Sequence, residues 1–197
     1  GAVAGVVKAN AYGLGAVQVA RALHAAGCRH FFVAHLSEGM ALRAGLGAGP
    51  MIAVLDGFAP GADENAGLVP VLNSLGDVLA HAAAGRSAGQ PRQALLHLDT
   101  GMARLGLDAG EQARLAEDHS LLAGLDLLYV MSHLACADGP DHPLNAEQAA
   151  RFARACAGLP RLPRSFANSS GLFLGADYAS DLARPGCALY GINPTPG

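Results

Sequence analysis

Eight short apolar runs alternate with longer amphipathic stretches, and this alternation constrains the fold more than any other feature. The runs have the length of β-strands. The first, second, third and sixth are apolar on both faces, as parallel strands covered by helices are. The expected strands are residues 3–8, 30–35, 51–55, 68–74, 94–100, 127–133, 163–169 and 183–191.

Helix signals stand between several of these runs. Residues 15–27 form an amphipathic stretch with Gly27 as a C-terminal stop, and a shorter helix is expected to begin near Ser37. Two capping-box patterns predict further helix starts, at Asp108 with Glu111 and at Asn145 with Gln148. The last of these helices is expected to end at residue 158.

Eight strands joined by crossover segments favour an α/β fold of the TIM-like (β/α)8 barrel type, with or without its terminal helices, in a single domain. A doubly wound open sheet is the main alternative. Such a sheet usually carries a glycine-rich phosphate fingerprint in its first strand-to-helix turn, and "KANAYGLG" does not fit that pattern.

Composition excludes several classes of function. The net charge of −3 comes from dispersed charges without a basic stripe, which argues against a nucleic-acid partner. We recognise no apolar run long enough to span a membrane and no secretory signal. The four cysteines lie far apart without a C-x-x-C pair, which predicts reduced thiols, no metal site and a cytoplasmic location.

Polar side chains gather at the predicted carboxyl ends of the strands, where barrel enzymes carry their catalytic groups. This set is poor in carboxylates, so glycoside hydrolysis by paired acids is disfavoured. The sequence has no H-E-x-x-H motif and no acidic cluster, which disfavours a metal-based mechanism. The set comprises Lys8, His35, Asn73, Asp99, Arg104, His133, Asn168, Ser169, Ser170 and Arg184.

Lys8 ends the first apolar run, and two interpretations are open for it. Its side chain either extends its charged head into solvent or lies desolvated in a site as a nucleophilic amine. The hydroxyls of "ANSSG" and the glycine amides of "RPGC" favour the second, because they stand where barrels commonly bind phosphate. A Schiff-base lysine that faces a phosphate pocket points to pyridoxal 5′-phosphate (PLP).

Five motifs together resemble one family. "VVKANAYGLG", "LDTGMARLG", "SHLACAD", "ANSSG" and "ARPGCALYG" occur in the family's order across essentially the whole chain. The chain is similar to the N-terminal PLP-binding barrel domain of alanine racemase, one of the fold-type III PLP enzymes. The resemblance implies an isomerase that interconverts L- and D-alanine and supplies D-alanine for peptidoglycan.

The resemblance also implies roles for individual residues. Lys8 would bond covalently to PLP and serve as the base on the D-face of the substrate Cα. Arg104 would lie near the phenolic oxygen of the cofactor and the substrate carboxylate. Arg184 would face the pyridine nitrogen, with His133 bracing it. Cofactor-phosphate contacts would come from Tyr12, Ser169, and the amides of Gly186 and Cys187, and Asn168 would also bind the cofactor.

The family's second catalytic base is a tyrosine from a C-terminal β-domain, which the partner subunit of a homodimer supplies. We therefore expect residues 1–190 to be the barrel, residues 191–197 to begin the connection to that domain, and residues 1–197 to be inactive alone. His97 stands where many members carry a lysine that can be carbamylated. It either orients Arg104 by a hydrogen bond or is simply packed.

Two other functions remain open. One is a single-domain PLP-binding carrier without racemase activity. The other is a racemase of a different amino acid, or a decarboxylase or aldolase relative on the same barrel. "SHLACAD" and "RPGCALYG" are closer to the alanine family than to the last two.

Overall fold

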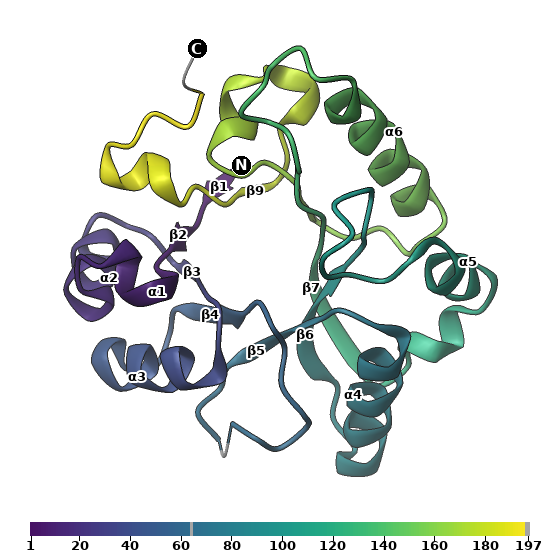
Figure 1. The fold of residues 1–197 in the computed structure, drawn as a ribbon. Coiled ribbons are helices and arrows are strands. Elements are labelled where there is room, and N and C mark those ends of the chain that lie inside the picture. Colours follow the sequence, from purple (N-terminus) through teal and green to yellow (C-terminus); the bar gives the residue numbers. More distant parts are fainter. Residues whose placement is uncertain (64, 196–197) are drawn as a thin grey trace.

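Parallel strands form a ring at the centre of the structure, and the helices lie outside it (Figure 1). The computed structural model describes residues 1–63 and 65–195. The strands are β1 (Ala2–Val3), β2 (Gly5–Val6), β3 (His30–Val33), β4 (Met51–Val54), β5 (Val69–Leu72), β6 (Arg92–His97), β7 (Leu125–Met131), β8 (Arg164–Ser165) and β9 (Leu182–Ala183). The helices are α1 (Lys8–Tyr12), α2 (Ala16–Ala25), α3 (Leu36–Leu46), α4 (Leu75–Ala88), α5 (Ala109–Glu117) and α6 (Pro143–Ala157).

Backbone contacts close the ring between its first and last strands. Strands β2 to β8 form one sheet whose order follows the sequence. β1 pairs in parallel with β9, and the N–H of Ala4 donates to the carbonyl of Ala183 over 2.9 Å. The N–H of Arg184 donates to the carbonyl of Ala167, which joins this pair to the segment after β8. The TIM-like barrel is therefore confirmed, whereas a doubly wound sheet would reverse its strand order.

Every predicted strand overlaps an observed one, but each observed strand ends before its predicted last residue, and β8, predicted to reach residue 169, ends at Ser165. β2 ends at Val6, and the chain turns at Lys8 instead of continuing as a strand. β9 ends at Ala183, and residues Cys187–Tyr190 form a short 3-10 turn. Pro185 has no N–H to donate to a ladder, which favours the early end of this strand.

Most of the predicted helix signals are confirmed. α2 is followed by Gly27, which has a φ of +101° and stops the helix. At the start of α5, the Asp108 side chain accepts from the N–H of Glu111 and the Glu111 side chain accepts from the N–H of Asp108. α3 begins at Leu36, one residue before the expected start.

The capping box predicted at Asn145 and Gln148 was wrong. α6 begins earlier, at Pro143, with the His142 side chain accepting from the N–H of Leu144. Asn145 and Gln148 are buried inside the helix and bind other loops. α6 is 15 residues long, and no helix within residues 1–63 and 65–195 is both long and apolar enough to cross a membrane.

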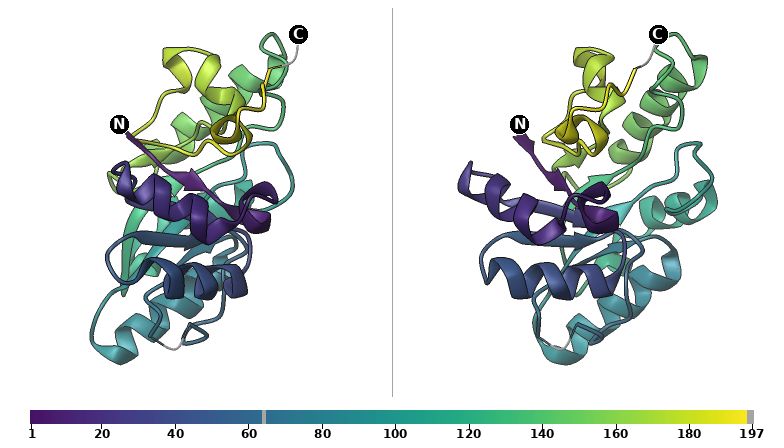
Figure 2. Two further views of the ribbon diagram at one scale, coloured as in Figure 1. Left: turned by 90° about the vertical axis from the view of Figure 1, so that its left-hand side faces the viewer. Right: turned by 60° about the vertical axis from the view of Figure 1, so that its left-hand side comes forward.

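Apolar side chains fill the ring and the space between the strands and the helices. One buried cluster draws on strands from all around the ring and forms its inside. Two others join the outer faces of the strands to the helices. In side view, α2, α3 and α4 follow one another around the outside of the ring (Figure 2). Burial on both faces explains why the central strands are apolar throughout.

Candidate functional site

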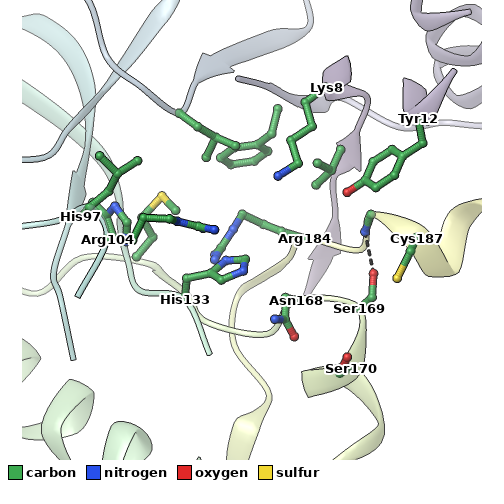
Figure 3. A pocket seen from close by; sticks show the side chains of 16 residues that line it. Lys8, Tyr12, His97, Arg104, His133, Asn168, Ser169, Ser170, Arg184 and Cys187 are labelled. Atoms are coloured by element: carbon green, nitrogen blue, oxygen red, sulfur yellow. Dashed lines mark hydrogen bonds between the residues drawn. The ribbon is translucent and has the colours of Figure 1, made fainter. Parts of the chain in front are cut away.

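A cavity of about 240 Å³ opens at the carboxyl ends of the strands (Figure 3). The nine residues to which the family resemblance assigns a catalytic or cofactor-binding role all line this cavity. Among the described lining residues three have cationic side chains and none has a carboxylate. His35, Asn73 and Asp99 do not line it. The polar lining residues are Lys8, Tyr12, His97, Arg104, His133, Asn168, Ser169, Ser170, Arg184 and Cys187.

Lys8 is the only lysine in the chain, since the other twelve basic residues are arginines. Its amine and the guanidinium groups of Arg104 and Arg184 point toward one shared space (Figure 3). A count of lysines in the sequence could have singled out this residue before any motif was considered. Apart from the N-terminal amine, the chain has no other amine with which a carbonyl compound could condense.

A left-handed turn follows Lys8 directly. Ala9, Asn10, Ala11 and Tyr12 all have positive φ values, between 50° and 55°. L-residues adopt this conformation at a cost of about 1–2 kcal/mol each, so such a run needs support from surrounding structure. The turn carries the Tyr12 side chain toward the residue 186 backbone, on the same side of the cavity as the Lys8 amine (Figure 3).

Gly186 makes room for the Tyr12 hydroxyl. A Cβ atom built on Gly186 would lie 2.2 Å from Tyr12 Oη, a separation that real side chains do not reach. Burial raises the pKa of Tyr12, with a smaller contribution from Cys187, so its hydroxyl stays protonated and can donate to an anion. The Tyr12 ring lies 5.0 Å from that of Tyr190, measured between centroids.

Hydrogen-bond donors surround the same end of the cavity. The buried Ser169 hydroxyl accepts from the N–H of Gly186 over 2.7 Å and from the N–H of Ala188 over 3.3 Å. These two N–H groups are thus paired with Ser169, whose own O–H remains to donate, and a hydroxyl is a group that binds a phosphate. Asn168 differs, because its amide oxygen accepts from Gly171 N–H and its nitrogen donates to the Leu134 carbonyl. Its side chain shapes the loop while lining the cavity.

Arg184 is a buried cation without an acidic partner in the described part of the chain. Its guanidinium donates to the Ser132 carbonyl over 2.6 Å and to the Ser165 hydroxyl. Burial lowers its pKa to about 10, so the group remains charged at neutral pH. These two serines supply the support that was expected from His133. A buried charge without a counter-ion is costly unless a ligand provides one.

The loop that carries Arg104 is fixed from both sides. Asp99 accepts hydrogen bonds from the backbone N–H groups of Gly101, Met102 and Ala103. The Gln112 side chain donates to the carbonyls of Asp99 and Leu107, at 2.8 and 2.6 Å. Arg104 itself is exposed at the cavity rim and is therefore free to contact a ligand.

His97 bonds to Asn73, and no bond between His97 and Arg104 is present among the described residues. His97 Nδ1 lies 2.7 Å from Asn73 Oδ1. The Asn73 nitrogen donates to the carbonyls of Leu55 and Val71, so its oxygen must accept. His97 Nδ1 therefore carries the proton and Nε2 keeps its lone pair. The sequence left two roles open for His97, a hydrogen bond that orients Arg104 or simple packing. His97 is buried, but it also makes a hydrogen bond, and this bond goes to Asn73.

Burial and the charge of Arg184 lower the pKa of both cavity histidines, His97 and His133, to about 3. An unfolded histidine titrates near 6.5. Below this pH the unfolded chain binds protons that the folded chain does not, so stability decreases as the pH falls toward 3. Each histidine should cost the cofactor-free protein about 1.5 kcal/mol of unfolding free energy between about pH 6.5 and 5.

Urea unfolding at several pH values measures this loss. We expect the loss to be smaller in a His133→Asn variant and to be kept in a His119→Asn variant, which changes an exposed histidine outside the cavity. Equal pH dependence in the wild-type protein and the His133→Asn variant would show that His133 is not held neutral by the fold.

The cavity therefore combines one amine, two guanidinium groups and a cluster of hydroxyl and amide donors. Such a set suits an anionic ligand with a reactive carbonyl group and a phosphate. No group of three or more His, Cys, Asp or Glu side chains that could hold a metal ion occurs in residues 1–63 and 65–195. All four cysteines are free thiols, as expected.

Residues 1–194 match the family model described as "Alanine racemase, N-terminal domain". The chain is 56% identical over 197 residues to "Alanine racemase, catabolic" of Mesorhizobium japonicum, covering 98% of this chain and 52% of that protein. It is 53% identical to "Alanine racemase" of Rhodospirillum rubrum, covering 98% and 53%. The chain thus spans about half the length of the curated relatives it matches.

Solved structures give the same result. An alanine racemase from Bartonella henselae with covalently bound pyridoxal phosphate has a TM-score of 0.94 and 43% sequence identity, and the match covers 98% of this chain and 57% of that one. An alanine racemase from Streptomyces coelicolor has a TM-score of 0.84 and 36% identity, with 98% and 54% covered.

Proposed function

Because the chain belongs to the family of alanine racemase N-terminal domains, we propose that its cavity binds PLP through Lys8 and that the whole protein interconverts L- and D-alanine. The observation that carries this proposal is the position of the only lysine, in a cavity with two arginines and no described carboxylate. A PLP site needs both an amine and compensation for negative charge.

The residues present fit PLP at both ends of the cavity. The Tyr12 hydroxyl, which the lack of a Cβ on Gly186 allows to lie against the residue 186 backbone, and the Ser169 hydroxyl beside it suit a phosphate. Arg184 is buried and lacks an acidic partner, so it would gain a hydrogen-bond acceptor in the pyridine nitrogen. A guanidinium stays protonated, so Arg184 would donate this hydrogen bond without transferring its proton.

Bound PLP supplies an electron-withdrawing ring that acidifies the substrate Cα–H bond. Lys8 would hold the cofactor until the substrate amine displaces it, and the freed Lys8 amine would then move the proton on the D-face of Cα. Arg104 binds the substrate carboxylate from the fixed loop at the rim. Racemisation also needs a base on the opposite face, and we propose that it comes from outside residues 1–197, in a homodimer of the whole protein.

Hydrogen exchange at Cα tests whether Lys8 acts on one face of the substrate while the base for the other face lies outside residues 1–197. Residues 1–197 loaded with PLP and incubated with D-alanine in D2O should exchange the Cα hydrogen for deuterium with little formation of L-alanine. Mass spectrometry measures the exchange, and chiral chromatography measures the racemisation. A whole protein that includes these residues should do both. Exchange without racemisation in the whole protein, or exchange in neither, would contradict the proposal.

The domain bounds, the location and the biological use belong to the same proposal. Residues 1–190 are taken as the barrel and 191–197 as the start of a connection, of which residues 196 and 197 lie outside the described residues. A cytoplasmic location stays a prediction, supported by the free thiols. Supply of D-alanine for peptidoglycan is the proposed use. A catabolic use is the alternative, because the relative from Mesorhizobium japonicum is named "Alanine racemase, catabolic".

The same exchange experiment, repeated with different amino acids, distinguishes the alternative functions that the sequence left open. A PLP carrier would bind the cofactor but exchange no Cα hydrogen in the whole protein. A racemase of another amino acid would exchange that amino acid faster than alanine. The family match over residues 1–194 supports alanine over both.

A further inference from the structure

The Glu38 carboxylate bridges the carboxyl ends of two neighbouring strands beside Lys8. Its Oε1 accepts from the N–H of Ala9 over 2.7 Å. Its Oε2 accepts from the N–H of Ala34 over 2.7 Å and from the N–H of His35 over 3.3 Å. The hydrogen bonds from Ala34 and His35 cap α3, whereas the bond from Ala9 reaches 29 residues back, to the residue that follows Lys8.

The register of the sheet shows why Ala9 needs this partner. The N–H of Val7 donates to the carbonyl of Phe32, as in a parallel ladder between β2 and β3. Two residues further on, a continuing strand would donate from Ala9 to Ala34. The left-handed turn removes Ala9 from the ladder, and the Ala34 carbonyl accepts instead from Asp56. The Glu38 carboxylate therefore accepts the hydrogen bond from the Ala9 N–H, which the turn has left without a partner in the sheet.

We propose that Glu38 is a positioning residue for the site: it holds the left-handed turn from Ala9 to Tyr12 and thereby aims the Lys8 amine and the Tyr12 hydroxyl at the cofactor. This inference rests on the proposed PLP function. Glu38 does not line the cavity, so it acts only through the backbone of the turn. Nothing in the sequence motifs identifies this role, since Glu38 stands 30 residues after Lys8 within another helix.

Charge alone predicts the opposite effect. Glu38 places a carboxylate beside a cationic cavity, so removal of its charge would strengthen the binding of an anionic cofactor. Loss of positioning would weaken it. The sign of the change in PLP affinity therefore separates the two explanations.

Two substitutions isolate the contact. Glu38→Gln keeps the length of the side chain but leaves a single acceptor oxygen for three N–H donors. Glu38→Asp keeps the charge and shortens the reach, so Ala9 loses its partner. The matched control is Glu111→Gln, because Glu111 also caps its own helix and accepts from a distant backbone, that of Leu75, over 2.9 Å. Glu111 does not line the cavity.

Amide hydrogen exchange of the cofactor-free 197-residue chain is the direct measurement. We expect amides 9–13 to exchange about tenfold faster in both Glu38 variants, as the loss of a charge-assisted hydrogen bond implies, and to be unchanged in the Glu111→Gln variant. Unchanged exchange of this segment in both Glu38 variants would overturn the proposal. This readout does not depend on PLP, so it stands even if the proposed function fails.

PLP titration is the second readout. We expect the apparent Kd for PLP to rise about tenfold in both Glu38 variants and by less than about twofold in Glu111→Gln. Tighter binding by Glu38→Gln would favour the charge explanation and overturn positioning. Equal weakening in Glu38→Gln and Glu111→Gln would reveal a merely structural effect and also overturn it. Absence of PLP binding in the wild-type chain would contradict the proposed function itself.

Discussion

Replacing Lys8 with arginine should abolish covalent capture of PLP while leaving the charge of the cavity unchanged. A guanidinium stays protonated and does not condense with the aldehyde of the cofactor. Because Lys8 is the only lysine, no other side-chain amine can take its place. The visible absorbance band of the covalent form should be lost completely, and borohydride should fix no pyridoxyl mass on a side chain. Reversible binding through the remaining cations should persist with lower affinity.

A double variant provides the matched control for this experiment. Lys8→Arg with Arg114→Lys keeps one lysine and the net charge but moves the amine to an exposed position on α5. We expect this protein to bind no more PLP covalently than Lys8→Arg does. Restored capture at position 114 would show that any accessible amine suffices and that the cavity contributes nothing.

Gly186→Ala should weaken PLP binding at least fivefold, because the new methyl group and Tyr12 Oη cannot occupy the same space. Relief of such a clash costs about 1–3 kcal/mol, which corresponds to roughly 5- to 150-fold in affinity when the ligand needs the original geometry. The displaced Tyr12 would no longer donate to the phosphate. A PLP titration followed by absorbance measures the affinity.

Gly139→Ala is the control for this substitution. Gly139 lies in a loop where a Cβ would meet its nearest atom at 3.7 Å, an ordinary contact, and it does not line the cavity. The variant should bind PLP like the wild-type protein. If Gly186→Ala binds PLP as tightly as Gly139→Ala, then Tyr12 and Gly186 do not form the phosphate end of the site.

The barrel was predictable because its signal is repeated. Several strands are compact apolar runs, as parallel strands buried on both faces are, and they alternate with helix signals along the chain. The location of the site followed from the same fact, since parallel strands bring their carboxyl ends to one rim. Lys8, Arg104 and Arg184 are far apart in the sequence, and the closed ring brings them to one cavity.

Other features depended on tertiary contacts that a local pattern does not contain. Four consecutive non-glycine residues in the left-handed region follow Lys8, although only Asn10 among them is of a type that favours this region. The turn depends on support by Glu38 from another helix. The Asn145 and Gln148 pattern resembles a capping box, but burial recruits Gln148 to bind the backbone of Ala135. α4 was missed although Ser74 caps it by accepting from Asp77 N–H.

Peptide mapping of the borohydride-reduced, PLP-loaded chain tests the central claim most directly. One pyridoxyl group per chain, on the peptide that contains Lys8, is the expected result. Label confined to the α-amine of Gly1, or no label in a protein that remains folded, would contradict the assignment of this cavity as a PLP site.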